Sequence, residues 1–545
     1  MRILSLAILI AAVLAEEEEK ATPMAMAIAA TLIGAVSFVL AMLYLTNHKD
    51  PDMRRYTYDI INETVSIFSA VLVFQSFNDT LETTVLEGKS ATLCVVAHFL
   101  HMFLWYGVMH LSLAYISGAI GEPPKSLEEV ELNMKSVAIV LGHLTGFASI
   151  NAWGSLQHLE YFSTPLMSFA VLPISILGQF VIQRCTDAMR RYVSLSDDGE
   201  WDDFEKFWDE EIEECENDIM ALSLSFSFIQ AARFVITSNL PNLEGAVHWQ
   251  ELQEQRMAGQ QFWLYAVGLC CAGVMLALFW LEKTIVHFLT NVIERIREAF
   301  TEKKAAEESE EEEEEVFQRA LETAVLTMSM CFAWCMFFST RIWLTVWPQL
   351  ADPMLSAVVL TMVITFVSLV SIRLLDLLAD AKWTDKKADR AVKQLIKAIA
   401  LGVGFAWEQC FDEAVASITS GLPYKHTAKV LLGILSVAFL APAWRLYLLP
   451  MTIRDGWKFG FVVQDHMDMG RKFVEVVDHL DSAKSWKARL GTVKTGSGDL
   501  AHVSKAIKSL MEIQQNNSSK ARSSFFSHLS DAGAVVAEGE RQPVE

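Results

Sequence analysis

The sequence Phe405-Ala-Trp-Glu-Gln-Cys-Phe-Asp-Glu413 lies inside an apolar segment that runs from Lys397 to Thr419. A helix of that length crosses a bilayer core of roughly 30 Å, at a rise of about 1.5 Å per residue. The segment nevertheless contains the carboxylates Glu408, Asp412 and Glu413. A charged side chain near the centre of a membrane helix costs on the order of 2.5–3.5 kcal/mol, so these acids should face protein, a cation or water. The stretch therefore predicts a polytopic membrane protein with a polar interior.

The composition of the 545 residues points to the same class. Hydrophobic residues make up 52% of the chain and charged residues 20%, below the roughly 25% of soluble domains. Much of the net charge of −22 falls in two stretches, 197–218 and 307–315. Nucleic acid is not expected as a partner, because phosphate binding requires basic clusters. Most cysteines lie in apolar segments, where they are expected to be small buried hydrophobic residues and not a disulfide framework.

Apolar blocks of about 20 residues predict an all-α fold with about 11 transmembrane helices. Residues 1–15 are short, apolar and followed by an acidic stretch, which is typical of a secretory signal peptide. The transmembrane domain then extends from 16 to 450. Its helices are predicted near 24–46, 59–80, 91–117, 136–157, 164–184, 218–238, 261–282, 320–345, 354–376, 397–419 and 428–450.

Four further stretches are expected outside the membrane. Residues 185–217 predict a cytoplasmic acidic amphipathic insertion, with aromatic residues at helical spacing. Residues 301–316 predict an acidic disordered loop, because long runs of like charge are usually solvated. Residues 451–515 are expected to form a cytoplasmic helical tail, and 516–545 a disordered C-terminus. The tail is a candidate binding segment for a cytoplasmic protein partner.

The basic residues indicate the orientation, since cytoplasmic connectors are enriched in Lys and Arg. Most of them fall in alternate connectors. These are Arg54, Arg55, Lys125, Arg184, Arg190, Arg191, Arg295, Arg297, Lys386, Lys387, Arg390 and Arg454. The mature N-terminus is therefore expected outside or in a lumen, and the C-terminus in the cytoplasm. We expect an integral membrane protein of the secretory pathway, located at the plasma membrane.

A weak internal similarity predicts a repeat. Phe405-Ala-Trp in the tenth predicted helix matches Phe332-Ala-Trp in the eighth, and related triplets begin at Phe147 and Phe226. Aligning the predicted helices on these triplets places polar or flexible side chains in one column: Gln75, Asn151, Gln230, Met336 and Gln409. We therefore expect one N-terminal helix followed by five helical hairpins that all point the same way across the membrane.

The polar residues inside these helices predict an ion pathway. Glu408 and Asp412 share a helix face because they are four residues apart. Glu408 is expected near the membrane centre, with Asp412, Glu413 and Asp79 toward the outer mouth. The amides Gln75, Asn151, Gln230 and Gln409 are expected to line the path at one depth. Oxygen-lined paths replace the hydration of cations, and desolvated carboxylates relay protons. The sequence thus favours a channel or transporter for protons or small inorganic cations.

Two arginines leave a second interpretation open. Arg233 and Arg341 lie inside predicted membrane helices, and they can tune the field of the path or form salt bridges with Asp412 and Asp79. In the second case the protein is a membrane scaffold without transport activity, and its cytoplasmic tail recruits a partner.

The histidines leave a third, remote alternative. His98, His110, His143 and His158 can be paired by depth, as in a transmembrane b-type haem protein. Cys94, His98 and His101 share a helix face but lack a fourth metal ligand. We expect these histidines to pack within the bundle, so neither a cofactor nor a metal is expected. The sequence shows no phosphate loop, nucleophile elbow or His-Glu-x-x-His motif, so enzyme activity is not expected.

Overall fold

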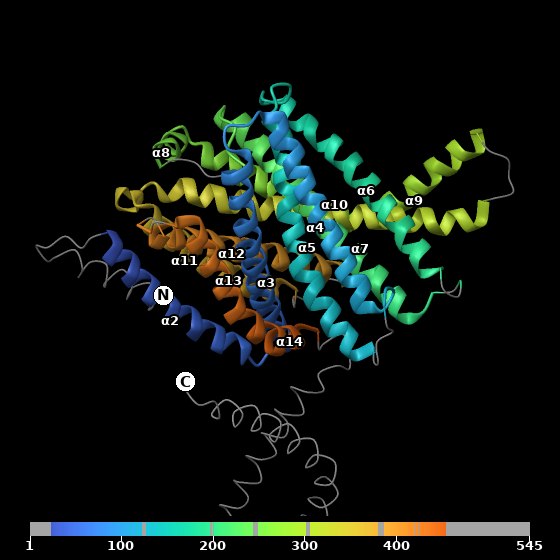
Figure 1. Cartoon of the computed structure of the whole chain (residues 1–545), viewed down its shortest axis with the longest axis horizontal. Coiled ribbons are helices and arrows are strands. Elements are labelled where there is room, and N and C mark those ends of the chain that lie inside the picture. Colours follow the sequence, from blue (N-terminus) through green and yellow to red (C-terminus); the bar gives the residue numbers. More distant parts are fainter. Residues whose placement is uncertain are drawn as a thin grey trace, which may run out of the picture. The chain divides into compact units, whose positions relative to one another are not determined.

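The computed structural model describes residues 23–121, 127–196, 199, 201–243, 249–300, 306–379, 386–419, 421–422 and 424–453. They belong to the first of two compact units, Met1–Phe461, and form helices without a strand (Figure 1). The α-helices are α2 (Pro23–Thr46), α3 (Pro51–Leu81), α4 (Ala91–Ser117), α5 (Leu127–Gln157), α6 (Val171–Ser194), α7 (Asp203–Thr237), α8 (Trp249–Met257), α9 (Gln260–Phe300), α10 (Ala306–Leu344), α11 (Pro353–Ala379), α12 (Lys386–Thr419), α13 (Lys425–Ala443) and α14 (Leu449–Ile453). Short π- or 3-10 helices are Glu82–Leu86, Met167–Ala170, Pro348–Ala351 and Trp444–Leu448.

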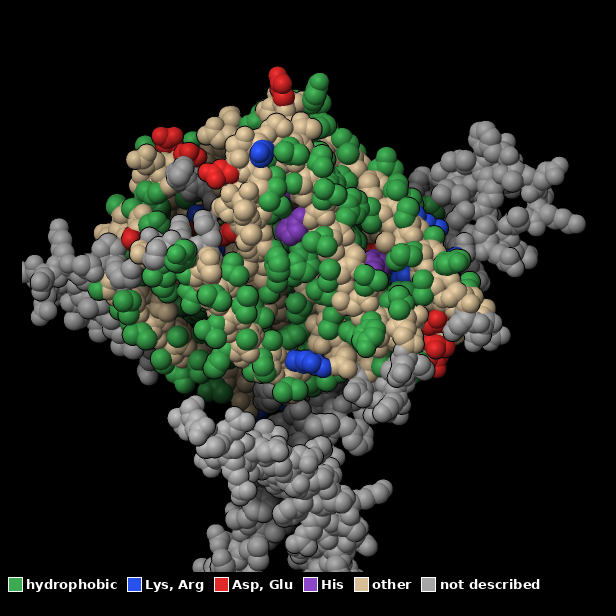
Figure 2. All heavy atoms as spheres, viewed as in Figure 1, with side chains coloured by type: hydrophobic (Ala, Val, Ile, Leu, Met, Phe, Trp, Pro, Cys, Tyr) green, Lys and Arg blue, Asp and Glu red, His purple; other side chains and the backbone are tan. Residues whose placement is uncertain are grey.

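Ten helices in the described part are long and apolar enough to cross a bilayer, as expected of an integral, multi-pass membrane protein. The predicted span 397–419 lies in α12, which is not one of these ten. Its polar and charged residues, Glu408 among them, lower its hydropathy. Hydrophobic side chains cover most of the face seen in Figure 2, and most of the visible charged side chains lie toward its margins.

The two acidic stretches are helical where the structure describes them. α7 begins at a capping box, in which Asp202 and Glu205 each accept a hydrogen bond from the backbone N–H of the other. The helix then continues unbroken to Thr237 and ends at Ser238, where φ is 60°. The predicted insertion 185–217 is therefore the end of α6 and the first half of α7. Residues 306–315 form the start of α10 where a disordered loop is expected, in keeping with the good helix propensity of Glu.

Several expectations concern residues that the structure leaves undescribed. The signal peptide 1–15 lies outside the described residues. The same holds for the helical tail beyond Ile453 and for the C-terminus 516–545.

Five of the described helices, α3, α5, α7, α10 and α12, form a closed inner ring in which each contacts the next and α12 returns to α3. Burial separates these inner helices from the outer ones. In the apolar windows of α3, α5, α7 and α10, between 56% and 78% of the residues are buried. The corresponding share in α2, α4, α6, α9, α11 and α13 is between 11% and 39%. The outer helices therefore present the apolar surface expected to face lipid, and the inner ring forms the core.

The inner helices run in the same direction, because the residue numbers of contacting pairs rise together along two neighbouring helices. Along α7 and α10, Asn217 bonds Arg319, Phe226 packs on Trp334, and Arg233 lies over Phe338. Each inner helix also contacts the helix before it more extensively than the helix after it. These pairs are α2–α3, α4–α5, α6–α7, α9–α10 and α11–α12. The hairpins expected from sequence begin one helix later than these pairs.

Aromatic side chains fill the ring on the side of α7, α10 and α12. Phe405 and Trp334, which belong to the matching Phe-Ala-Trp triplets, meet edge to face with ring centroids 4.4 Å apart. Phe226 and Phe337 complete the group, at 5.2 Å from Trp334 and 5.0 Å from Phe405. The triplets that suggest a repeat thus supply the packing between inner helices.

Candidate functional site

Polar residues follow the contact between α3 and α12, which we call the α3–α12 seam (Figure 1). The two helices run in register along it. Lys397 lies near Glu63, Glu408 bonds Gln75, and Asp412 and Asp79 share one ion-pair partner. From Asp59 to Asp79, α3 rises about 30 Å, the thickness of a bilayer core. The seam therefore carries polar groups from one side of such a core to the other.

Glu408 lies beside Gln75, nearer the Asp79 end of the seam than the Asp59 end, and is 1% exposed. Gln75 Nε2 donates a hydrogen bond of 2.6 Å to its Oε1. This partner is a neutral amide, and the contact holds the carboxyl group in place. A carboxylate so placed can bind a proton or accept a cation, since burial penalises its charged form.

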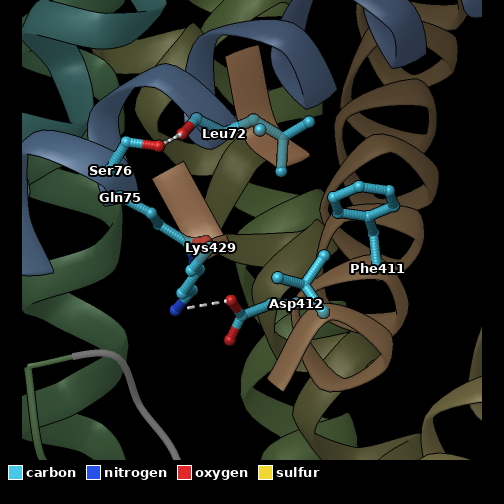
Figure 3. Close-up of a pocket in the computed structure, with 8 residues that line it drawn as sticks. Leu72, Gln75, Ser76, Phe411, Asp412 and Lys429 are labelled. Carbon is cyan, nitrogen blue, oxygen red and sulfur yellow. Dashed lines mark hydrogen bonds and ion pairs between the residues drawn. The ribbon is translucent and has the colours of Figure 1, made fainter. Parts of the chain in front are cut away.

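At the C-terminal end of the seam, a lysine links two of the predicted acids. Lys429, on α13, places its Nζ 2.7 Å from Asp79 Oδ2 and 2.8 Å from Asp412 Oδ1. Figure 3 shows the side chains of Lys429 and Asp412 pointing toward one another beside Gln75. A pocket of about 10 Å³ lies here and is lined by Leu72, Gln75, Ser76, Phe411, Asp412, Val415, Lys429 and Gly433. It has room for about one water molecule.

At the N-terminal end of the seam lies a larger cavity of about 70 Å³, which has both apolar and charged side chains in its lining. Its charged lining consists of Arg55, Asp59, Glu63 and Lys397. Glu214 and Asp218 of α7 are also close enough to Lys397 to interact with its charge. Acids from α3 and α7 therefore surround a lysine of α12. The four charged residues of the lining, two basic and two acidic, balance one another.

The two polar regions are separated by tight apolar packing. A Cβ at Gly404 would lie 3.3 Å from the backbone Cα of Thr64 and 3.4 Å from Ile67 Cβ. Ile67 is fully buried, and Phe68 packs edge to face on Phe411 at 5.1 Å. The seam is thus closed between the 70 Å³ cavity and Glu408 in this conformation.

The two predicted arginines do not pair with Asp79 and Asp412. Arg233 donates to Gln230 Oε1 at 3.0 Å and lies 3.9 Å from the centre of the Phe338 ring. Arg341 interacts electrostatically with Glu413 and with Arg233. Lys429 takes the role that the salt-bridge interpretation assigns to the arginines. The signal that could have identified it is a lysine one turn inside the last apolar helix, at the same end as Asp412.

The predicted amide column is divided among different contacts. Gln75 bonds Glu408, Asn151 Nδ2 donates to Asn78 Oδ1 at 3.0 Å, and Gln230 Nε2 donates to the carbonyl of Asn242 at 2.8 Å. Gln409 is half-buried beside Glu408. Of the predicted pathway residues, Gln75, Glu408, Asp79 and Asp412 come together along the seam. Asn151 and Gln230 instead bond other groups on or beside the inner helices.

The membrane histidines lie beside carboxylates. His98 Nε2 is 3.9 Å from Glu82, His110 Nε2 is 3.5 Å from Glu216, and His143 Nε2 is 3.9 Å from Glu63. His101 instead accepts a hydrogen bond from Trp105 at 2.8 Å. Within the described residues, no three His, Cys, Asp or Glu side chains are placed to hold one metal ion. These contacts give no support to the haem alternative.

Sequence reasoning missed a buried ionic network at the N-terminal ends of the inner helices. Arg190 is fully buried, with Nε 2.5 Å from Asp209 Oδ1 and Nη1 3.4 Å from Glu216 Oε1. Arg319 Nη2 lies 2.9 Å from Glu216 Oε2, and its Nη1 lies 2.8 Å from Glu213 Oε1. Asp187 contacts both arginines. The network joins α6, α7 and α10. Its signal in the sequence is the i, i+4, i+7 spacing of the α7 acids.

Comparisons with protein-family models, with characterised proteins and with solved structures find no match.

Proposed function

We propose that this chain is a channel or transporter that moves protons or small cations across a membrane along the α3–α12 seam. The observation that carries the proposal is Glu408, a carboxyl group buried between α3 and α12 that is 1% exposed and bonded to the amide of Gln75. An ionisable residue inside a membrane helix is costly and usually functional. The cavity at Glu63 and the acids at the other end supply the two mouths of the path.

The seam is closed in this conformation, and transport requires α3 and α12 to separate near Gly404. We further propose that the N-terminal ends of the inner helices face the cytoplasm, in a membrane of the secretory pathway such as the plasma membrane. The basic residues of the sequence support that orientation.

A membrane scaffold is the second candidate, and one contact favours it. Lys429 forms an ion pair with both Asp79 and Asp412, and the salt-bridge interpretation requires such pairs for a structural role. In that interpretation Glu408 has no role in transport. Neither the parent nor a Glu408 variant would move ions, and the substitution would change only the stability of the protein.

Flux through purified protein in liposomes separates the two candidates. We compare the parent with Glu408→Gln, using an internal pH-sensitive dye and imposed gradients of protons, Na⁺ or K⁺. Glutamine keeps the hydrogen bond with Gln75 but cannot ionise, so we expect flux to fall to the level of protein-free liposomes. Glu322→Gln is the matched control, because Glu322 is an exposed carboxylate on another inner helix, and it should transport like the parent.

Two outcomes would contradict the proposal. The seam is not the path if Glu408→Gln transports like the parent. A well-folded parent that moves no ion under any gradient would favour the scaffold.

A further inference from the structure

Lys429 occupies the position that a cation would take between the two acids of the seam. Its ammonium lies 2.7 Å from Asp79 and 2.8 Å from Asp412, so three helices, α3, α12 and α13, meet at one positive charge. The three side chains are between 19% and 32% exposed. α13 is held close to α3 here, because a Cβ at Gly433 would lie 3.1 Å from Ser76 Oγ. The lysine is therefore a tethered cation at a fixed place.

Among the side chains that the structure describes, the other charges that act on this group are two acids and one arginine. Glu82 interacts electrostatically with both Asp79 and Lys429, and Glu413 interacts with Asp412, Lys429 and Arg341. The charge of Arg341 is shared with Glu413 and lies on a different helix, α10. Without Lys429, Asp79 and Asp412 would form a pair of like charges that attracts a cation from solution.

The space along the seam suits a proton better than a metal ion. The pocket at Lys429 measures about 10 Å³, room for one water molecule. A metal cation needs several oxygen ligands or its own water shell, whereas a proton passes along a chain of carboxyl groups and waters. The tight contact of Gly404 with Thr64 and Ile67 sets the same limit at the other side of Glu408.

We propose that the seam carries protons and that Lys429 excludes metal cations by holding their position with its own ammonium. The proposal rests on the proposed function of the same seam. It makes Lys429 a specificity-determining residue, while the proton passes between Glu408 and Asp412, the acid that lines the water-sized pocket.

The test measures proton, Na⁺ and K⁺ flux for three proteins in liposomes: the parent, Lys429→Met and Lys429→Arg. The parent should move protons in a Glu408-dependent manner and leave alkali cations at the level of empty liposomes. Lys429→Met leaves the two acids without their tethered cation, so it should conduct Na⁺ or K⁺. Lys429→Arg keeps the charge and should stay selective for protons.

A second measurement, of Na⁺ binding, is needed because a misfolded variant would also show no flux. The thermal unfolding of each detergent-solubilised protein is followed in NaCl and in N-methylglucamine chloride of equal ionic strength. An ion that binds the folded state alone raises the unfolding temperature. We expect Na⁺ to stabilise Lys429→Met by a few degrees and to leave the parent unchanged. The variant Asp79→Asn/Lys429→Met/Asp412→Asn removes all three charges and should lose the response.

The outcomes separate this inference from the function on which it rests. Glu408-dependent Na⁺ or K⁺ flux through the parent would overturn the inference and leave the transport proposal standing. So would a Lys429→Met protein that stays selective for protons and shows no response to Na⁺. Absence of every flux from a folded parent would overturn both.

Discussion

At the scale of single residues, the strongest electrostatic constraint is Arg190. Its side chain is fully buried among Asp187, Asp209 and Glu216, and Arg319 contacts two of the same acids. A buried charge costs several kcal/mol unless its partners compensate, and removal of one partner leaves the others uncompensated. The network therefore couples α6, α7 and α10 through charge as well as apolar packing.

Arg190→Met should lower the free energy of unfolding by about 3 kcal/mol, because Glu216 and Asp187 would then share Arg319 as their remaining arginine and Asp209 would lose its ion pair. Thermal or denaturant unfolding in detergent measures the effect. Arg184→Met is the control on the same helix. The Arg184 side chain is 50% exposed and pairs with Asp187 at 3.5 Å, so its loss should cost at most about 1 kcal/mol. Equal stability of both variants would mean that Arg190 does not hold the network together.

At the scale of helices, the α3–α12 contact depends on a glycine, Gly404, which has no side chain. Gly404 allows the backbones of the two helices to approach so closely that even a Cβ would lie 3.3 Å from Thr64 Cα. The same contact closes the seam between its 70 Å³ cavity and Glu408. Packing and gating therefore depend on one position.

Gly404→Val should destabilise the protein by about 1–3 kcal/mol, because added methyl groups overpack a tight contact. It should also increase backbone hydrogen exchange in α3 and α12 relative to α5 and α7. The control is Gly273→Val on the outer helix α9, where a Cβ would meet no atom within 4 Å. That variant should match the parent within about 0.5 kcal/mol. If both variants unfold alike, α3 and α12 are not packed closely at Gly404.

At the scale of the whole described bundle, the inner helices form a ring whose members run the same way, and the outer helices cover it. The most extensive contacts between consecutive helices join an outer helix to the inner helix that follows. This leaves α13, the last of the described helices that could span a membrane, without such a partner, and it supplies Lys429 to the seam. The bundle is thus completed by an element outside the paired pattern.

Cysteine accessibility tests this arrangement. Cys215, Cys331 and Cys335 are buried on inner helices, whereas Cys185 and Cys270 are exposed on outer helices. A small maleimide should modify Cys185, which lies toward the C-terminal end of α6, in the detergent-solubilised native protein, as read by mass spectrometry of peptides. The three inner cysteines should react only after unfolding, since burial denies the reagent access. Rapid native modification of Cys331 or Cys335 would contradict the ring.

The sequence by itself determined the class of the protein and the places of its helices, since apolar length and composition are local properties. It also identified Glu408 as a buried acid and Asp79 and Asp412 as members of one polar region, because a carboxylate in an apolar helix must find a polar neighbour. Only the tertiary structure decided which neighbour each acid has. Helical periodicity gives the face and depth of Asp412, but Lys429 and Arg341 both satisfy those limits. The choice between them depends on which helix packs on the seam, and the close approach of α13 at Gly433 settles it in favour of Lys429.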